Sequence, residues 1–224
     1  SQTRGGLYCQ YFSETQYPDV SQYSIPQINF EGNYSGVLND LQNIINTNTS
    51  NNMTQLARIL KAYIYAQITD CWGDVPYSQA LTGASTPAFD KQADIYPALI
   101  QELTQAGAAF NTTSAITGDI IYSGSTAKWR KFANSLRMRL ALQLTKKFPA
   151  AGGYAAQQFV AALNDAGGYI ADNADNCIVK FPGGNFKSSW YNLYDGRKDY
   201  GESNTMTALM SSLGDARQNA FGGL

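Results

Sequence analysis

The chain has 224 residues, of which 44% are hydrophobic and 15% are charged, and its formal net charge is -1. This length allows one sizeable domain with its own core. The lysines and arginines form no long basic stripe, so no nucleic-acid-binding surface is expected, and no apolar run has the length of a membrane span.

The residue types limit the chemistry. Histidine is absent, so Ser-His-Asp and Cys-His catalytic arrangements within this chain are excluded. Cys9, Cys71 and Cys177 lie far apart and form no Cys-x-x-Cys spacing, so we expect neither a disulfide framework nor a metal site. Aromatic residues beside many amides and hydroxyls suit recognition of neutral ligands such as sugars, although an ordinary extracytoplasmic surface has the same composition.

The first part of the chain lacks a sustained period. Residues 1 to about 30 are rich in Tyr, Gln, Ser and Pro, and we expect them to be extended or irregular. From Tyr34 to Ile45, apolar residues recur at three- and four-residue steps, which predicts a helix. The Asn-rich segment 46–52 ends this helix, because such side chains bond their own backbone.

A second helix is predicted over residues 53–70, with Thr54 as its candidate N-cap. It stops at DCWGDVPY, where Gly73 permits a left-handed turn and Pro76 forbids continuation. Two large aromatic residues, Trp72 and Tyr77, stand at this stop. We expect them to pack the helix end onto the next hairpin.

Four more helices follow. The pattern over residues 90–110 is helical, but Pro97 requires that the regular helix begin near Asp94 or that it kink. Ser125 or Thr126 caps the next helix, in which Trp129 lies on the apolar stripe and is expected in the core. Ser203 is the expected cap of the last one. These three later helices are predicted over residues 127–147, 155–165 and 203–213.

The predicted fold is therefore mainly α. About six helices follow one another with long polar loops between them, which is typical of stacked helical hairpins of the tetratricopeptide type. The repeat period is not clean.

Several segments occur in an order that resembles a known family. They are ARILKAYIYAQITDCWGDVPYSQAL, FDKQADIYPALIQELTQA, GDIIYSGSTAKWRKFANSLRMRLALQL and NTMTALMSSLGDAR. Over about residues 30–217 the series resembles the SusD/RagB family of surface glycan-binding lipoproteins from Bacteroidetes. Any one segment alone is weak, and the order of all four is specific.

The resemblance implies tetratricopeptide-like hairpins that form a SusD-like α-superhelical scaffold with long irregular loops. It implies one SusD-like domain over residues 1–224, which we expect to be incomplete at both ends. It implies a location at the cell surface of the outer membrane, through a lipidated N-terminus that is not in this chain, and a SusC-like TonB-dependent transporter as the partner. Such proteins capture oligosaccharides, or peptides in some branches, without catalysis, and no cofactor or metal is expected. One departure is Ser125, where the family commonly has Asp.

The candidate ligand contacts lie outside the family segments. A sugar ring presents a C–H face that packs on an aromatic plane, while amide and carboxylate groups bond its hydroxyls. The loop SSWYNLYDGRKDY combines both kinds of group, and the alternative is a loop held to the body by its own aromatics. The candidates in this loop are Trp190, Tyr191, Asn192, Tyr194, Asp195 and Arg197.

The aromatic N-terminal stretch is the second candidate region, although no residue there matches a fixed motif. It contains Tyr8, Tyr11, Tyr17, Tyr23, Phe30 and Tyr34. The segment DNADN (172–176) lacks the following Gly and the bidentate Glu of a calcium loop and is interpreted as a turn.

Three functional hypotheses follow. The first is a non-enzymatic protein that captures glycans and delivers them to a transporter. The second is the same scaffold specialised for peptides. The third is a helical-repeat interaction scaffold without a small ligand. A carboxylate-only hydrolase is the least favoured, since it needs two acids facing each other across a cleft.

Overall fold

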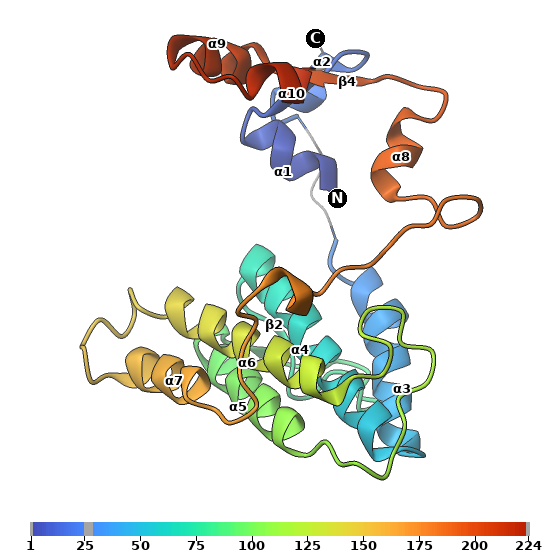
Figure 1. Ribbon diagram of the computed structural model, residues 1–224, viewed down its shortest axis with the longest axis vertical. Coiled ribbons are helices and arrows are strands. Elements are labelled where there is room, and N and C mark those ends of the chain that lie inside the picture. The colour runs from blue at the N-terminus through green and yellow to red at the C-terminus, as the bar shows by residue number, and fades with distance from the viewer. Residues whose placement is uncertain (1, 25–28, 223–224) are drawn as a thin grey trace. The chain divides into compact units, whose positions relative to one another are not determined.

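Figure 1 shows the computed structural model, which describes residues 2–24 and 29–222. The chain divides into two compact units. The first unit consists of Ser1–Ile28 and Phe181–Leu224, and the second unit consists of Asn29–Lys180. The chain therefore begins in the first unit, forms the second, and returns to the first.

The second unit is a succession of helices in which each packs on the next, α3 on α4, α4 on α5, α5 on α6 and α6 on α7 (Figure 1). This confirms the mainly helical fold. No helix in the described part of the chain is long and apolar enough to cross a membrane. The helical elements of the second unit are η1 (Tyr34–Leu38), α3 (Asn39–Thr47), α4 (Asn51–Trp72), α5 (Gln92–Ala108), α6 (Thr126–Gln143), α7 (Tyr154–Leu163) and η2 (Asn173–Asp175).

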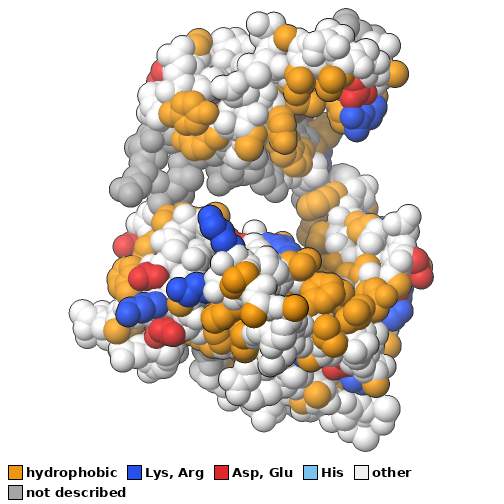
Figure 2. All heavy atoms as spheres, turned by 90° about the vertical axis from the view of Figure 1, so that its left-hand side faces the viewer, with side chains coloured by type: hydrophobic (Ala, Val, Ile, Leu, Met, Phe, Trp, Pro, Cys, Tyr) orange, Lys and Arg blue, Asp and Glu red, His pale blue; other side chains and the backbone are white. Residues whose placement is uncertain are grey.

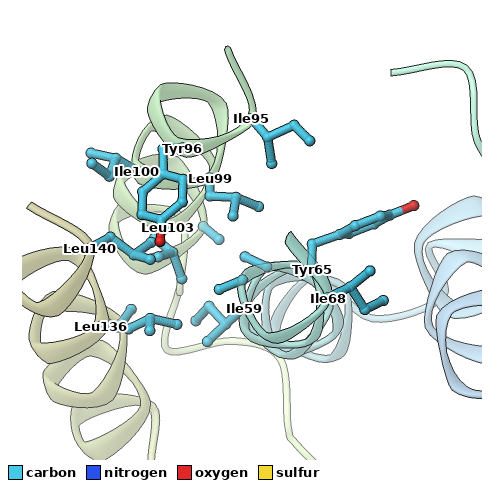
Figure 3. Close-up of a cluster of buried hydrophobic side chains, with 14 of the residues drawn as sticks. Ile59, Tyr65, Ile68, Ile95, Tyr96, Leu99, Ile100, Leu103, Leu136 and Leu140 are labelled. Carbon is cyan, nitrogen blue, oxygen red and sulfur yellow. The ribbon is translucent and has the colours of Figure 1, made fainter. Parts of the chain in front are cut away.

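The core of the second unit lies where α4, α5 and α6 meet (Figure 3). Apolar residues spaced by three or four along each helix face this junction, as the sequence pattern predicts. Trp129 is 1% exposed, which confirms its expected core position. The side chains shown there include Ile59, Leu99, Leu103, Leu136 and Leu140.

A short antiparallel pair closes the loop between α4 and α5. Strand β2 (Val75–Pro76) pairs with β3 (Phe89–Asp90), with Val75 opposite Asp90. Helix α4 ends at Trp72, and Gly73 adopts φ +74° immediately after it. The expected stop at the GDVPY segment is therefore confirmed.

The first unit is built from both ends of the chain. Strand β1 pairs antiparallel with β4, so that Phe12 lies opposite Glu202. Leu7 and Met210 are its buried apolar side chains among the described residues, so its core is small. Its elements are α1 (Gln2–Tyr8), β1 (Phe12–Glu14), α2 (Pro18–Ser21), α8 (Ser189–Tyr194), β4 (Tyr200–Glu202), α9 (Asn204–Ser212) and α10 (Gln218–Gly222).

The expectation of irregular structure for residues 1 to about 30 was wrong for three short elements, α1, β1 and α2. Helices of seven and four residues are too short to show a hydrophobic period. The strand depends on partners almost 190 positions later in the chain. Residues 25–28 of this stretch lie outside the described residues.

Two helix starts also differ from the predictions. Helix α4 begins at Asn51, so Thr54 is not its cap, and the Thr54 hydroxyl instead donates to the Asn48 side chain at 2.9 Å. Helix α5 begins at Gln92, which places Pro97 inside it rather than near its first residue. The caps at Ser125 and Ser203 are confirmed, since each side chain accepts a backbone N–H of the helix that follows.

Candidate functional site

The eight candidate residues fall in both units. Six of them lie in α8 and the turn after it, in the first unit, whereas Phe30 and Tyr34 lie in the second. Within the described residues, a hollow lined by candidate residues lies in each unit. The two hollows have different linings.

Helix α8 presents three aromatic side chains to solvent. The Ser188 side chain caps it by accepting the Tyr191 backbone N–H at 3.0 Å. The exposed fractions of Trp190, Tyr191 and Tyr194 are 45%, 51% and 46%. Trp190 and Tyr194 are four positions apart and therefore share one face of the helix.

A cluster of rings joins α8 to the β1–β4 pair. Phe12 of β1 makes edge contacts with Trp190, at 6.0 Å between ring centroids, and with Tyr200, at 5.7 Å. The Tyr194 hydroxyl donates to the Tyr200 carbonyl at 3.3 Å. The strand pair thus holds aromatic groups from distant parts of the sequence together.

Beside this cluster lies a hollow of about 590 Å³, called here the tyrosine hollow. Glu202 supplies its carboxylate, and the Oε1 atom of Glu202 is buried with no hydrogen-bond partner among the described residues. In the space-filling view, hydrophobic side chains reach the surface of the first unit (Figure 2). The lining residues are Tyr11, Phe12, Tyr194, Tyr200, Gly201, Glu202, Met206 and Phe221.

Tyr194 is the one predicted residue of the 188–200 loop in this lining. Lys187 lies 4.5 Å above the Tyr191 ring and forms a 3.1 Å ion pair with Asp195. Arg197 forms a 2.6 Å ion pair with Asp199. Tyr191, Asp195 and Arg197 thus have partners within the chain, as the alternative interpretation of this loop expects. Asn192 is exposed and its side chain has no polar partner among the described residues.

Sequence reasoning missed Phe12, Tyr200 and Glu202. Their position in the hollow follows from the pairing of β1 with β4, two three-residue strands. The only available signal was local, an aromatic residue and a carboxylate in each of FSE and YGE. Strands this short give no reliable alternation, so the pairing was not predictable.

The second hollow, called here the proline hollow, has a volume of about 420 Å³ and lies in the second unit. Phe30 makes edge contacts with the rings of Tyr34 at 5.8 Å, Trp72 at 6.0 Å and Phe89 at 6.1 Å. The lining residues are Phe30, Glu31, Tyr34, Pro76, Ala80, Leu81, Ser85, Pro87 and Phe89.

A hydrogen bond joins Tyr34, in the wall of the proline hollow, to Pro76 of the GDVPY family segment. The Tyr34 hydroxyl donates to the Pro76 carbonyl at 2.6 Å. Burial, with the nearby Asp90 carboxylate, raises the pKa of Tyr34 to about 12, so the hydroxyl stays protonated. Trp72 and Tyr77 pack against the core, as expected, and the Tyr77 ring meets Tyr65 edge-on at 4.8 Å.

A sequence model of the SusD-like family, described as "Starch-binding associating with outer membrane", matches residues 1–224. The chain belongs to this SusD-like family. This confirms the resemblance noted from the order of its segments. No curated protein matches the sequence.

Solved structures agree with the SusD-like assignment. A chitin-binding protein is 28% identical, with a TM-score of 0.79 over 96% of this chain and 48% of that chain. A SusD homologue from Bacteroides uniformis is 27% identical, with a TM-score of 0.74 over 95% and 47%. A chitin-binding SusD homologue from Flavobacterium johnsoniae is 23% identical, with a TM-score of 0.79 over 96% and 48%, and shows the fold alone.

The SusD-like chain described here spans about half the length of these solved structures. The scaffold helices that carry the family segments are all present, and both hollows form from residues of this chain.

Proposed function

We propose that this SusD-like chain captures glycans at the cell surface without cleaving them. The observation that carries the proposal is the tyrosine hollow, which is lined by five aromatic side chains and the carboxylate of Glu202. The description of the family as starch-binding supports a glycan as the ligand, as do the names of two solved relatives as chitin-binding.

The hollow suits a sugar for a simple reason. A pyranose ring is apolar on its C–H face and polar at its edge. Tyr11, Tyr194 and Tyr200 supply flat apolar surface with hydroxyls at their ends. Glu202 also lines the hollow, and a carboxylate accepts hydrogen bonds from hydroxyl groups.

The residues that line the two hollows favour binding of a glycan rather than its hydrolysis. Glycosidases use two carboxyl groups held about 5 to 9.5 Å apart across the scissile bond. Among the described residues, Glu202 is the one carboxylate that lines the tyrosine hollow, and Glu31 the one that lines the proline hollow. Histidine, the commonest general base, is absent from the chain.

The cellular setting is the finer part of the proposal. The family description associates these proteins with the outer membrane. We infer that a lipidated N-terminus anchors the whole protein at the cell surface and that a SusC-like TonB-dependent transporter receives the glycan. The energy for import then comes from the transporter system.

The test is calorimetric titration with soluble starch, chitin oligomers and mixed oligopeptides. Tyr194→Ala removes one wall of the tyrosine hollow, and Trp190→Ala removes its neighbour on α8. Tyr194→Ala is expected to weaken glycan binding about tenfold or more, the loss expected when a central aromatic contact is truncated. Trp190→Ala is expected to weaken it less, because Trp190 lies outside the lining and supports it through Phe12. Tyr169→Ala is the matched control, because Tyr169 is an exposed tyrosine that lines neither hollow.

Two outcomes contradict this proposal. Binding of peptides alone identifies the chain as a peptide-capturing member of the same scaffold. Binding of no glycan by the wild-type chain removes the proposal altogether. Co-purification of a SusC-like transporter with the membrane-anchored protein tests the partner separately.

A further inference from the structure

The proline hollow has a different chemistry from the tyrosine hollow. Most of the side chains that line it are apolar, and two of these are the rings of Pro76 and Pro87. The apolar lining consists of Phe30, Pro76, Ala80, Leu81, Pro87 and Phe89.

Most polar groups of this lining already have partners. The Tyr34 hydroxyl donates to the Pro76 carbonyl, and the Glu31 carboxylate accepts from the Asn29 side chain at 2.9 Å. Ser85 keeps a hydroxyl without a partner among the described residues. A sugar ring placed wholly inside would leave most of its hydroxyls unpaired, which is costly in an apolar site.

The loop that forms the hollow is fixed before any ligand arrives. The Asp90 carboxylate accepts from the Tyr77 and Ser78 backbone N–H groups at 2.9 and 2.7 Å and from the Ser78 hydroxyl at 2.7 Å. The β2–β3 pair closes the same loop at its ends. Leu81 is held at φ +64°, a conformation that bulky residues rarely adopt. A small ligand therefore meets a hollow that is already formed.

Phe89 differs from the rest of the lining because its side chain is 63% exposed. Its ring packs nearly perpendicular to that of Phe30, with 6.1 Å between the centroids, and most of the Phe89 side chain stays open to solvent. A sugar can stack on this ring while a substituent enters the hollow. The part of the substituent that enters must then be apolar, such as a methyl group, while its polar atoms stay at the rim.

We propose that the proline hollow binds the acyl substituent of an acylated glycan, such as the acetamido group of a 2-acetamido sugar, while Phe89 stacks on the sugar ring. This inference rests on the proposed glycan-binding function and names the class of sugar. An unsubstituted glucan offers a hydroxyl at the same position and gains nothing from the apolar walls. The hollow thus selects acylated over plain glycans.

The test compares two oligosaccharides with the same β-1,4-linked backbone, the N-acetylglucosamine hexamer and the glucose hexamer, in calorimetric titrations of the whole chain. The wild-type chain is expected to bind the acetylated hexamer at least about fourfold tighter, which corresponds to burial of one methyl group per site. The variant Ser85→Phe places a ring at the exposed rim of the hollow and is expected to abolish this preference. Its matched control, Thr86→Phe, adds the same ring at a neighbouring exposed position outside the lining and is expected to retain it.

The outcomes separate this inference from the proposed function. Equal binding of both hexamers, or a preference that survives Ser85→Phe, overturns the acyl pocket and leaves glycan capture intact. No binding of either hexamer, of starch or of other glycans overturns both. Binding of a phenylalanine- or leucine-containing peptide that Ser85→Phe removes shows an apolar side-chain pocket, and it also overturns the acyl proposal.

Discussion

Asp119 is the residue on which the turn before α6 is built. Its carboxylate accepts the backbone N–H groups of Ile121, Tyr122 and Gly124 at 2.9 to 3.1 Å and the Trp129 indole N–H at 2.8 Å. Removing it leaves four donors without their partner, one of them on a core side chain. We expect Asp119→Ala to lower the free energy of unfolding by about 3 kcal/mol, measured by urea denaturation.

The control for this prediction is Asp94→Ala. Asp94 is an exposed carboxylate whose side chain has no polar partner among the described residues. Its loss is expected to cost about 0.5 kcal/mol or less, the contribution of a charge in the first turn of α5. Equal losses in the two variants would show that the turn at Asp119 contributes no more than surface charge.

Asp119 and two other hydrogen-bonded carboxylates, Asp90 and Asp165, make the stability of the fold depend on pH. Burial of Asp90, Asp119 and Asp165 opposes ionisation, but hydrogen bonds from neighbouring N–H groups and side chains outweigh it and hold each pKa below the ordinary 3.8. Such groups stabilise the fold fully above the unfolded pKa, and their contribution is lost as pH falls through the folded values. We expect the free energy of unfolding to fall steeply below about pH 4.

Urea denaturation at several pH values between neutral and acid measures this slope. Asp119→Ala removes one of the three depressed carboxyls and should show a shallower fall than the wild-type chain. An unchanged slope in that variant would mean that Asp119 does not titrate in the folded state below its unfolded pKa.

Among the elements, α5 carries a defect at Pro97. The helix runs from Gln92 to Ala108, so this proline lies inside it and lacks the N–H that would donate to the carbonyl of Ala93. Proline inside a helix is unfavourable by about 3 kcal/mol relative to alanine. We expect Pro97→Ala to raise the free energy of unfolding by about 1 kcal/mol or more. A fall instead would mean that the packing of the proline ring outweighs the missing hydrogen bond.

An element was predicted well where the interactions that form it lie within its own sequence, and less well where they involve distant residues. Helix α6 has a long apolar stripe, a serine cap and a core tryptophan, and all three follow from its own sequence. Helix α4 begins three residues before the expected cap because Asn52 is held by a distant loop. Its side-chain amide donates to the carbonyls of Asn111 and Ser114 at 2.8 and 2.5 Å. No pattern within α4 contains this information.

The candidate sites follow the same rule. The aromatic run of α8 is visible in the sequence, and its Tyr194 does line the tyrosine hollow. Glu202 reaches that hollow through a strand pair between the two ends of the chain, which local patterns do not reveal. Arg197 and Asp195 look like ligand contacts by composition, but each forms an ion pair within its own loop. Composition identifies suitable residue types, and only the fold shows which ones have partners.

At the scale of the whole molecule, the two units differ in how they are stabilised. The apolar cluster where α4, α5 and α6 meet lies entirely within the second unit. The first unit depends on a short strand pair and a few buried side chains. A unit that contains its own core is expected to fold without the other.

We therefore expect a fragment of residues 29–180 to fold alone, with helical circular dichroism and one cooperative urea transition. Leu103→Ala, which opens a cavity at a fully buried position of this core, should lower the free energy of unfolding by about 2–5 kcal/mol, and equally in the fragment and in the whole chain. The fragment should also keep the preference for the acetylated hexamer, because every residue of the proline hollow lies within it. A fragment that is unfolded, or a cavity cost that differs between fragment and chain, would mean that the second unit depends on the first for its core.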